Sequence, residues 1–431
     1  MTRRPDRRTV ESWALLAVAT LGGLALCLAA PHGTLAVLGF LAATAAATAI
    51  GCRGPLALPR RALWTAMGVL AIGAVLRAPI GSHDLWSYAM YGRVAAVHHA
   101  DVYRVAPAHF PRDPVLRLVG RGWRHTTCAY GPVFVAMASV IARLAGTHVV
   151  AIRLCYQVPA ALAALAGARI AEHTSGDARS AALVGLQPFV WASVVNGGHN
   201  DVWVGLAAIV AVVAATRARP VTAGLALAVG ALVKSTTLLA APAIAIWLLA
   251  RRRYGEAARL TLVTGTVAVV GTALAPRSAT GAAHATAGVV TRASIWQVFV
   301  GPHGLTPSIA TAIGLALTGV IALAAAVAGR HADRPSIAAA VGLAAYTFAG
   351  VYVLPWYAFW ALPTAAASRR RALAAVLAVH GGLLAATYAV GRAPVAHRFW
   401  AGTLTTVVPS ATAVIAVAVG AAALRPRATS V

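Results

Sequence analysis

The sequence is poor in acidic residues. It has 10 Asp and Glu among 431 residues, against 36 Lys and Arg, and its formal net charge is +26 at pH 7. A nucleic-acid-binding protein can carry such a charge. Here, however, the basic residues stand in small groups between apolar runs, as at Arg251–Arg253 and Arg369–Arg371. That distribution is typical of the cytoplasmic loops of membrane proteins, so we expect no nucleic-acid partner.

Cysteine is also scarce, and recognisable cofactor motifs are absent. The four cysteines follow no metal-binding or disulfide-rich spacing, so we expect them to be small apolar side chains. The sequence has no P-loop, no dinucleotide-binding glycine pattern and no motif for a Ser or Cys nucleophile. His83/Asp84 and His199/Asp201 carry metal-ligating residue types, but nothing in their spacing requires the two pairs to meet. We expect neither a metal nor an organic cofactor.

Long apolar runs are abundant in the sequence. Hydrophobic residues make up 60% of the chain and charged residues 11%. Runs rich in Ala, Leu and Val recur that are long enough to cross a hydrocarbon core of about 30 Å. They are continuous rather than alternating, which favours helices over a β-barrel. We therefore predict an all-α polytopic membrane protein, one membrane domain over residues 1–431, with about 12–14 transmembrane helices.

The positions of the basic residues predict how the spans are oriented across the membrane. The Arg-rich N-terminus is placed in the cytoplasm, so spans over 12–30, 34–50 and 63–79 deliver Asp84 to the outer face. The remaining spans are predicted at 148–171, 181–196, 199–216, 220–234, 236–250, 257–275, 308–328, 335–352, 355–368, 372–390 and 402–424. Residues 276–307 form a second outer loop.

The first outer loop, residues 80–147, contains one ambiguous apolar segment, 129–146. If this segment crossed the membrane, the Arg251–Arg253 group would lie outside, against the usual charge rule. We therefore predict that it lies flat at the outer surface, as an interfacial helix does. Asp101 and Asp113 of this loop are expected to be solvated surface acids.

Asp84 lies just after the outer end of the predicted span 63–79, in the stretch Ser82–Tyr88. Residue types alone leave two roles open: capping the helix that starts at Leu85, or taking a proton from a substrate hydroxyl as a general base. Asp201 ends a second polar stretch, Asn196–Asp201, between two apolar runs. It is predicted either to cap the following helix or to belong to a substrate or lipid-phosphate site.

Lys234 and the pair Trp356–Tyr357 also lie at the ends of predicted spans. Lys234 is predicted either to extend to the membrane interface or to bind a lipid phosphate. Trp356 and Tyr357 follow Pro355 and are predicted either to belong to an interfacial aromatic belt or to line a site. The loop 276–307, which carries Arg292, offers a basic outer surface suited to an anion.

Several short motifs together resemble a known family. They are Ser82–Tyr88, Asp101–Tyr103, Asp113–Leu116 with Trp123–Arg124, Tyr130–Pro132, Asn196–Asp201, Leu232–Lys234 and Pro355–Tyr357. In order and spacing, over roughly residues 63–365, they resemble the actinobacterial polyprenyl-phosphate-mannose-dependent α-1,6-mannopyranosyltransferases of the GT-C superfamily. Two segments depart from the pattern: Val102 stands where the family has Pro, and Thr126–Ala129 lacks the expected Pro. These departures leave the acceptor and the linkage open.

The resemblance implies a GT-C fold whose large first outer loop carries membrane-parallel helices. It implies that Asp84 is the general base, that the β-linked donor mannose is inverted to an α-linkage, and that polyprenyl phosphate leaves without help from a metal. The substrate-binding residues it implies are His83, Tyr88, Arg93, Tyr103, Tyr130, His199, Asn200, Asp201, Lys234, Trp356 and Tyr357.

The resulting prediction is a mannosyltransferase of the cell membrane whose active site faces outward. Its partners would be polyprenyl-phosphate-mannose as donor, a lipid-linked mannan or glycolipid as acceptor, and membrane lipid. Transfer of another polyprenyl-phosphate sugar such as arabinose, or α-1,2-mannosylation, stays open. A lipid or polysaccharide transporter is the alternative outside the enzymes; it predicts paired repeats and charges buried in mid-span, and neither is visible.

Overall fold

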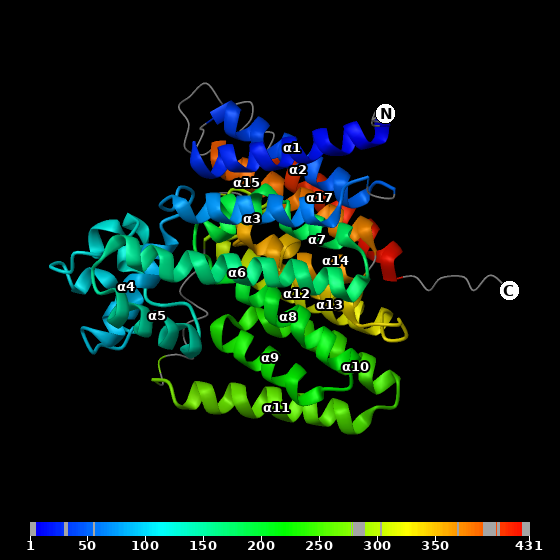
Figure 1. Cartoon of the computed structure of the whole chain (residues 1–431). Coiled ribbons are helices and arrows are strands. Elements are labelled where there is room, and N and C mark those ends of the chain that lie inside the picture. Colours follow the sequence, from blue (N-terminus) through cyan, green and yellow to red (C-terminus); the bar gives the residue numbers. More distant parts are fainter. Residues whose placement is uncertain are drawn as a thin grey trace.

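The computed structural model of the chain is a bundle of helices. It describes all residues except 1–5, 30–32, 55–56, 277, 279–288, 302–303, 369, 391–401, 403–405 and 425–431. The bundle comprises α1 (Arg7–Leu28), α2 (Gly33–Cys52), α3 (Arg60–Leu76), α6 (Val149–Ser175), α7 (Ala178–Gly185), α8 (Asp201–Thr216), α9 (Pro220–Val233), α10 (Ala241–Ala250), α11 (Tyr254–Ala273), α12 (Pro307–Ala328), α13 (Ser336–Ala349), α14 (Leu362–Ala367), α15 (Arg371–Val390) and α17 (Val408–Leu424). The described residues contain no β-strand, so the all-α prediction is confirmed (Figure 1).

The helices coincide closely with the predicted spans, with a few exceptions. The predicted span 181–196 is wrong as one helix: α7 ends at Gly185, and a separate π-helical turn follows at Val190–Val195. Pro188 lies between them, and proline lacks the N–H that a continuing helix needs. The predicted spans 236–250 and 355–368 begin as 3₁₀ turns, Ser235–Ala240 and Pro355–Trp360, before α10 and α14. Part of the predicted span 402–424 and of the second outer loop lies outside the described residues.

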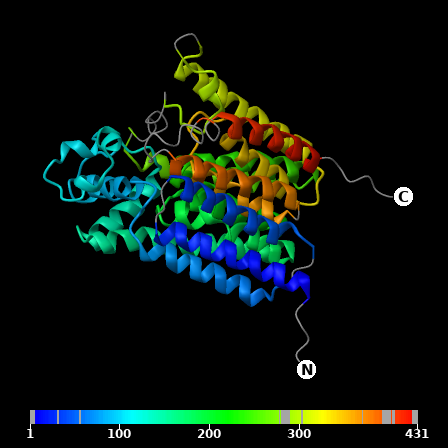
Figure 2. The ribbon, with the colours of Figure 1, turned by 90° about the horizontal axis from the view of Figure 1, so that it is seen from above.

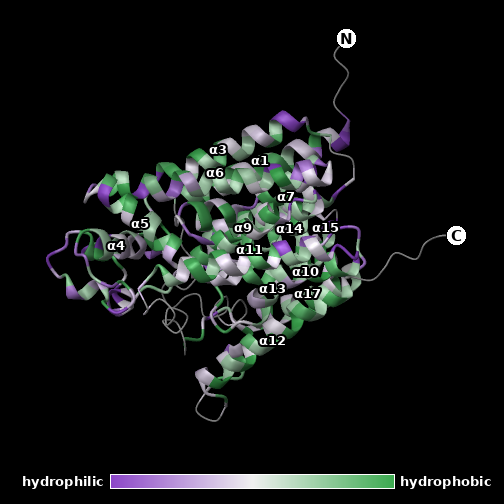
Figure 3. Cartoon of the chain, turned by 90° about the horizontal axis from the view of Figure 1, so that it is seen from below, coloured by the Kyte–Doolittle hydropathy of each residue, from purple (hydrophilic) through white to green (hydrophobic). Residues whose placement is uncertain are grey.

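Five of the described helices are long and apolar enough, by length and composition, to cross a membrane: α1, α2, α6, α12 and α15. Others, including α8, α9 and α13, are apolar but shorter. Figure 3 shows hydrophobic residues along the sides of the bundle and hydrophilic ones gathered toward its two ends. This distribution is the one a membrane protein requires, because a lipid-facing surface must be apolar.

A separate layer lies beyond one end of the bundle. It contains α4 (Asp84–Ala96) and α5 (Pro132–Ala145), which project past the ends of the other helices (Figures 1 and 2). The two pack closely, because a Cβ atom at Gly92 would lie 2.1 Å from the Ala138 carbonyl oxygen. With 14 residues, α5 is about 21 Å long. It lies outside the bundle, and the assignment of 129–146 to the membrane surface stays a prediction.

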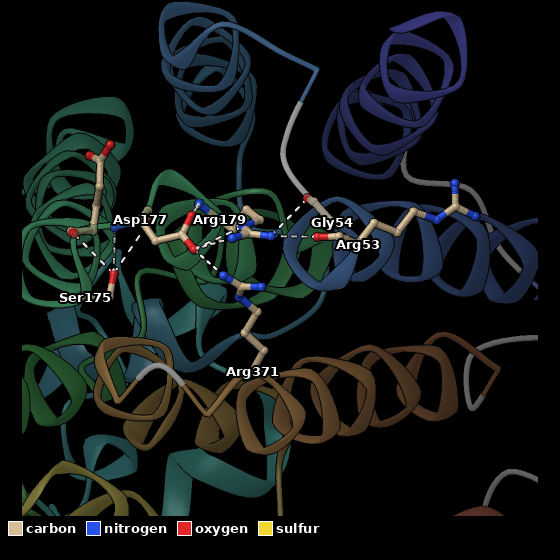
Figure 4. A network of polar contacts seen from close by, with 7 residues as sticks. Arg53, Gly54, Ser175, Asp177, Arg179 and Arg371 are labelled. Atoms are coloured by element: carbon tan, nitrogen blue, oxygen red, sulfur yellow. Dashed lines mark hydrogen bonds and ion pairs between the residues drawn. The ribbon is translucent and has the colours of Figure 1, made fainter. Parts of the chain in front are cut away.

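Charged side chains join the helices at the opposite end, here called the far end (Figure 4). The Asp177 carboxylate pairs with Arg179, at 2.9 Å, and with Arg371 at the start of α15. Arg179 also donates to the carbonyl oxygens of Arg53 and Gly54, 2.9 Å each, just after α2. Asp177 and Arg179 together therefore connect three segments that are distant in the sequence.

Candidate active site

Asp84 is the first residue of α4, at the join between the bundle and the outer layer. His83 is the N-cap residue, and neither its side chain nor the Asp84 carboxylate accepts a backbone N–H of α4. The Asp84 N–H itself donates to Ser82 Oγ at 3.0 Å. The carboxylate is therefore not used as a helix cap, and the capping alternative is wrong.

Burial changes the acidity of Asp84. Its side chain is 12% exposed, and removal from water raises the pKa of the carboxyl group from 3.8 to about 6. The Ser82 hydroxyl opposes this rise in the pKa, whereas the nearby Asp201 carboxylate adds to it. A carboxylate with a pKa near 6 is mostly ionised at neutral pH and still basic enough to accept a proton from a substrate.

A cavity of about 510 Å³ opens beside Asp84. Its lining comes from the loop before α4, the turn around Gly120, the segments near Thr291 and Leu354, and the end of α15. The residues include Ser82, His83, Asp84, Arg121, Trp123, Arg292, Tyr352, Trp356 and Tyr388. Its volume lies in the usual range for small-molecule sites, about 300–1,000 Å³. The cavity combines one carboxylate with two guanidinium groups and several aromatic rings.

His199 lies directly behind Asp84. Its Nδ1 atom is 3.6 Å from Asp84 Oδ2 and 3.3 Å from the Tyr88 hydroxyl, to which the Tyr130 hydroxyl donates at 3.4 Å. The imidazole stacks on Trp356, with 3.6 Å between ring centroids. Burial holds the pKa of His199 well below its usual value, so the ring is neutral. Its Nε2 atom is buried and has no hydrogen-bond partner among the described residues.

Asp201 and Lys234 form a buried pair behind His199. Lys234 Nζ and Trp360 Nε1 each donate to Asp201 Oδ1 at 2.6 Å, and Lys234 Nζ lies 4.3 Å from the centroid of Tyr357. Asp201 is only 1% exposed in its side chain and accepts no N–H of α8. Both alternative predictions are therefore wrong: Asp201 does not cap α8, and Lys234, 14% exposed, does not extend to an interface.

The remaining predicted residues divide between the site and its surroundings. Trp356 and Tyr357 are 7% and 6% exposed, so they are not part of an interfacial belt. Asn200 is buried, and its amide has no partner among the described residues. Arg93 and Tyr103 point elsewhere: Arg93 pairs with Asp113 at 2.7 Å, and Tyr103 lies in the apolar cluster of the outer layer.

Asp113 itself corrects a prediction. We expected a solvated surface acid, but its side chain is fully buried and accepts from Arg93 and from His98 Nε2 at 2.8 Å. Burial is the largest single effect on the pKa of Asp113 and raises it. The charge-assisted contacts together outweigh burial, so the pKa of Asp113 lies below its usual value. Asp113 therefore joins α4 to the following loop and fixes the outer layer.

Asn196 connects the two polar stretches of the site. Its Oδ1 atom accepts from the Ile80 N–H at 2.8 Å, and its Nδ2 atom donates to the carbonyl oxygens of Ala74, Arg77 and Ala78 at 3.0–3.3 Å. These carbonyls belong to the end of α3 and the turn after it, where a helix lacks partners of its own. One buried amide thus holds the turn that leads to Asp84 against the stretch that carries His199.

Sequence reasoning missed several residues of the site. Trp360 and Asn196 had a usable signal, because Trp360 follows Tyr357 by three positions in a 3₁₀ turn and Asn196 begins the polar stretch. Arg121, Tyr352 and Tyr388 had none: they reach the cavity from three separate segments that only the tertiary fold brings together.

Comparisons with known proteins agree on one family. A family model described as alpha-(1->6)-mannopyranosyltransferase, N-terminal domain, matches residues 8–251. The chain is 28% identical over 199 residues to an alpha-(1->6)-mannopyranosyltransferase A of Corynebacterium glutamicum, covering 45% of this chain and 39% of that one. It is 32% identical over 182 residues to the enzyme of that name from Mycobacterium tuberculosis, covering 40% and 34%. The matched part thus spans less than two fifths of these relatives.

Among solved structures, the chain is similar to an archaeal oligosaccharyltransferase from Archaeoglobus fulgidus, solved in complex with an inhibitory peptide and a dolichol-phosphate. The identity is 12% and the TM-score 0.40, over 85% of this chain and 56% of that one. This likeness is weak and adds nothing to the family match.

Proposed function

This chain belongs to the alpha-(1->6)-mannopyranosyltransferase family, and from that premise we propose that it transfers mannose from polyprenyl-phosphate-mannose to a lipid-linked mannan or glycolipid. The product is an α-1,6 bond formed with inversion, on the extracytoplasmic face of the cell membrane. Residues 8–251, which match the family, contain Asp84, Tyr88, Tyr130, His199, Asp201 and Lys234. Of the residues that line the cavity, those from Gly81 to Trp123 lie inside the matched range, and those from Val289 to Tyr388 lie outside it.

The observation that carries the proposal is the state of Asp84. It is a buried carboxylate that lines a cavity of about 510 Å³, and burial raises its pKa to about 6. It serves no cap, and in the part of the chain that the structure describes it forms no ion pair with Arg or Lys. Buried acids are otherwise neutralised by a partner, as Asp113 and Asp201 are here. A carboxylate left basic at the wall of a cavity fits a general base.

The chemistry requires one base and no acid. In the proposed step Asp84 accepts the proton of the acceptor hydroxyl, and the oxygen of that hydroxyl attacks C1 of the β-linked mannose. The C1–O bond to phosphate breaks with inversion, and polyprenyl phosphate departs as an anion that needs no proton. Arg121 and Arg292 line the same cavity as Asp84, and guanidinium groups suit a phosphate geometrically and by charge. We assign the donor phosphate to their side of the cavity.

The aromatic residues give the sugar a place. Trp123, Tyr352 and Trp356 line the cavity, and aromatic faces pack against the apolar side of a pyranose while its hydroxyl groups bond to polar neighbours. Behind them, neutral His199 stands between Asp84 and Tyr88 and keeps a polar contact to the carboxylate without neutralising it. We assign His199 to positioning Asp84.

The experiment that tests the function is transfer from radiolabelled polyprenyl-phosphate-mannose to mannose acceptors by the purified chain, followed by linkage analysis. We expect label in an α-1,6-linked product. Label from a polyprenyl-phosphate pentose, with none from the mannose donor, would overturn the sugar assignment. An α-1,2 product would overturn the linkage. No transfer from any donor, with the donor lipid instead moved across a vesicle membrane, would support a transporter.

A further inference from the structure

A second cavity lies at the far end of the bundle, between α6, α8 and α9. Its volume is about 460 Å³. The residues that line it are Arg169, Ile170, His173, Thr174, Val210, Val213, Ala214, Arg217, Arg219 and Thr222. Helix α8 packs against both of its neighbours, so the cavity lies over α8 with α6 and α9 as its walls.

This cavity is distant from Asp84. On α6, Arg153 belongs to the Asp84 end, where it donates to the Val75 carbonyl oxygen at the end of α3 at 2.6 Å. Arg169 follows 16 positions later on the same helix, which at 1.5 Å per residue is about 24 Å. That separation is close to the thickness of a hydrocarbon core, about 30 Å. The second cavity therefore belongs to the opposite membrane surface and takes no part in transfer.

The lining is cationic. It holds three arginines and one histidine, and no acidic residue lines it. Among the described residues, Arg217 and Arg219 have no ion pair or side-chain hydrogen bond, and Arg169 has one, at 3.7 Å from Glu172. Glu172 is itself bound more closely by Arg60, at 2.5 Å. Like charges held around one cavity repel one another, and a bound anion would remove that repulsion.

The walls continue as exposed apolar faces. On α6, Leu162 is 62% exposed and precedes Arg169 by seven positions, so it lies on the same face of the helix. On α9, Leu225 and Val229 are 42% and 46% exposed and follow Thr222 by three and seven positions. The floor includes Val210 and Val213. A ligand here would meet cationic groups at the far end and apolar side chains along the bundle.

We propose that this cavity binds an anionic phospholipid. The phosphate headgroup would contact Arg169, Arg217 and Arg219, and the acyl chains would lie along the apolar faces of α6 and α9. A soluble phosphate would satisfy the charges but leave those apolar faces without a ligand, so the combination favours a lipid of the membrane leaflet opposite Asp84.

The test measures lipid binding to the full chain by native mass spectrometry in detergent. The probes are phosphatidylglycerol and phosphatidylcholine with identical acyl chains, because they differ in net charge. We expect phosphatidylglycerol to bind with preference. The double variant Arg217→Gln/Arg219→Gln should bind it about 30-fold less tightly, since each basic residue near an anionic lipid contributes about 1 kcal/mol and 1.4 kcal/mol is a factor of ten in affinity. Inorganic phosphate should not compete.

The matched control is Arg252→Gln/Arg330→Gln. It removes two exposed arginines from the same end that do not line the cavity, and it should retain the preference. Thr222→Trp, which keeps every charge and fills the cavity, should weaken lipid binding as well. Equal binding by the cavity variants and the parent chain would overturn the proposal, as would equal loss in the control. Full competition by inorganic phosphate would make this a site for a soluble anion.

Discussion

At the scale of single residues, the three buried acids of the site region differ in how their charge is balanced. Asp113 accepts from Arg93 and His98, and Asp201 accepts from Lys234 and Trp360. Among the described residues, Asp84 has the Ser82 hydroxyl and the neutral imidazole of His199, at 3.6 Å, but no ion pair with an arginine or lysine. Burial without a close cation raises its pKa to about 6. The residue with the least compensation is the one that lines the cavity, which is why the general base is assigned to it.

This assignment predicts the pH dependence of transfer. The base must be ionised, so the rate at saturating substrate should fall as the pH drops through about 6, tenfold per pH unit below it. Above pH 7 the rate should be flat. The measurement is the rate of mannose transfer between pH 4.5 and 8.5. A rate that stays constant from pH 8 down to pH 4.5 would contradict the assignment.

The Asp201–Lys234 pair predicts a stability effect. Lys234→Met leaves a carboxylate buried and uncompensated, so the free energy of unfolding should fall by about 3–5 kcal/mol. Lys234→Met combined with Asp201→Asn should recover part of that loss, because the isolated charge is gone. Denaturant unfolding in detergent of the two single variants and the double variant measures the coupling. Strictly additive losses would show that the two residues do not interact.

At the scale of elements, the site depends on where helices end. Helix α3 ends at Leu76, α4 begins at Asp84, and the turn between them is held by Asn196. Gln157 of α6 strengthens the same place: its Nε2 atom donates to the carbonyl oxygens of Asn196, at 2.6 Å, and Arg77, at 3.1 Å. Two buried amides therefore satisfy the end of α3 and fix the direction from which Asp84 enters the cavity.

Asn196→Asp tests that arrangement. The carboxylate can still accept from the Ile80 N–H but cannot donate to the three carbonyl oxygens. We expect the turnover number to fall by roughly tenfold, because a displaced base aligns poorly, and the acid limb of the pH profile to move. The measurements are kcat, KM and the pH profile. A lower yield of folded protein with an unchanged kcat and pH limb would mean that Asn196 only supports folding.

The sequence was informative about elements and less so about their partners. Apolar run length located nearly every helix, because lipid-facing and core-facing surfaces are both apolar and leave long continuous runs. It failed at 181–196, where Pro188 breaks the helix inside an apolar run. Residue types misjudged Asp113 and did not indicate that Lys234 pairs with Asp201, because these ion pairs join positions 20 and 33 apart. The order of residue types along the chain does not indicate which distant residues pair in the fold.

At the scale of the whole molecule, the two ends of the bundle have different characters. The Asp84 end has an added layer, α4 and α5, and the cavity of the candidate active site. The far end has the Asp177 network and the cationic cavity between α6, α8 and α9. Basic residues collect on the cytoplasmic side of membrane proteins, so this polarity is the physical basis for placing the Asp84 end outside.

Labelling of introduced cysteines tests that orientation. In a Cys52→Ser background, because Cys52 is the exposed native cysteine among the four, Arg104→Cys reports on the outer layer and Arg330→Cys on the far end. Arg104 is 74% exposed in its side chain. A membrane-impermeant maleimide should label Arg104→Cys in intact cells and Arg330→Cys only after permeabilisation. The reverse pattern would place the active site in the cytoplasm.

The most direct test of the whole account is the Asp84→Asn variant, with Asp101→Asn as its control in the same outer loop. Burial raises the pKa of folded Asp84, so its ionisation lowers stability as the pH rises through about 6. The asparagine variant should therefore unfold at a temperature no lower than the parent chain at pH 7.5. Its rate of mannose transfer should nevertheless fall by at least about 100-fold, since a general base contributes about 10²–10⁴, while Asp101→Asn stays within a few fold. A folded Asp84→Asn protein that transfers mannose at the parent rate would contradict the account.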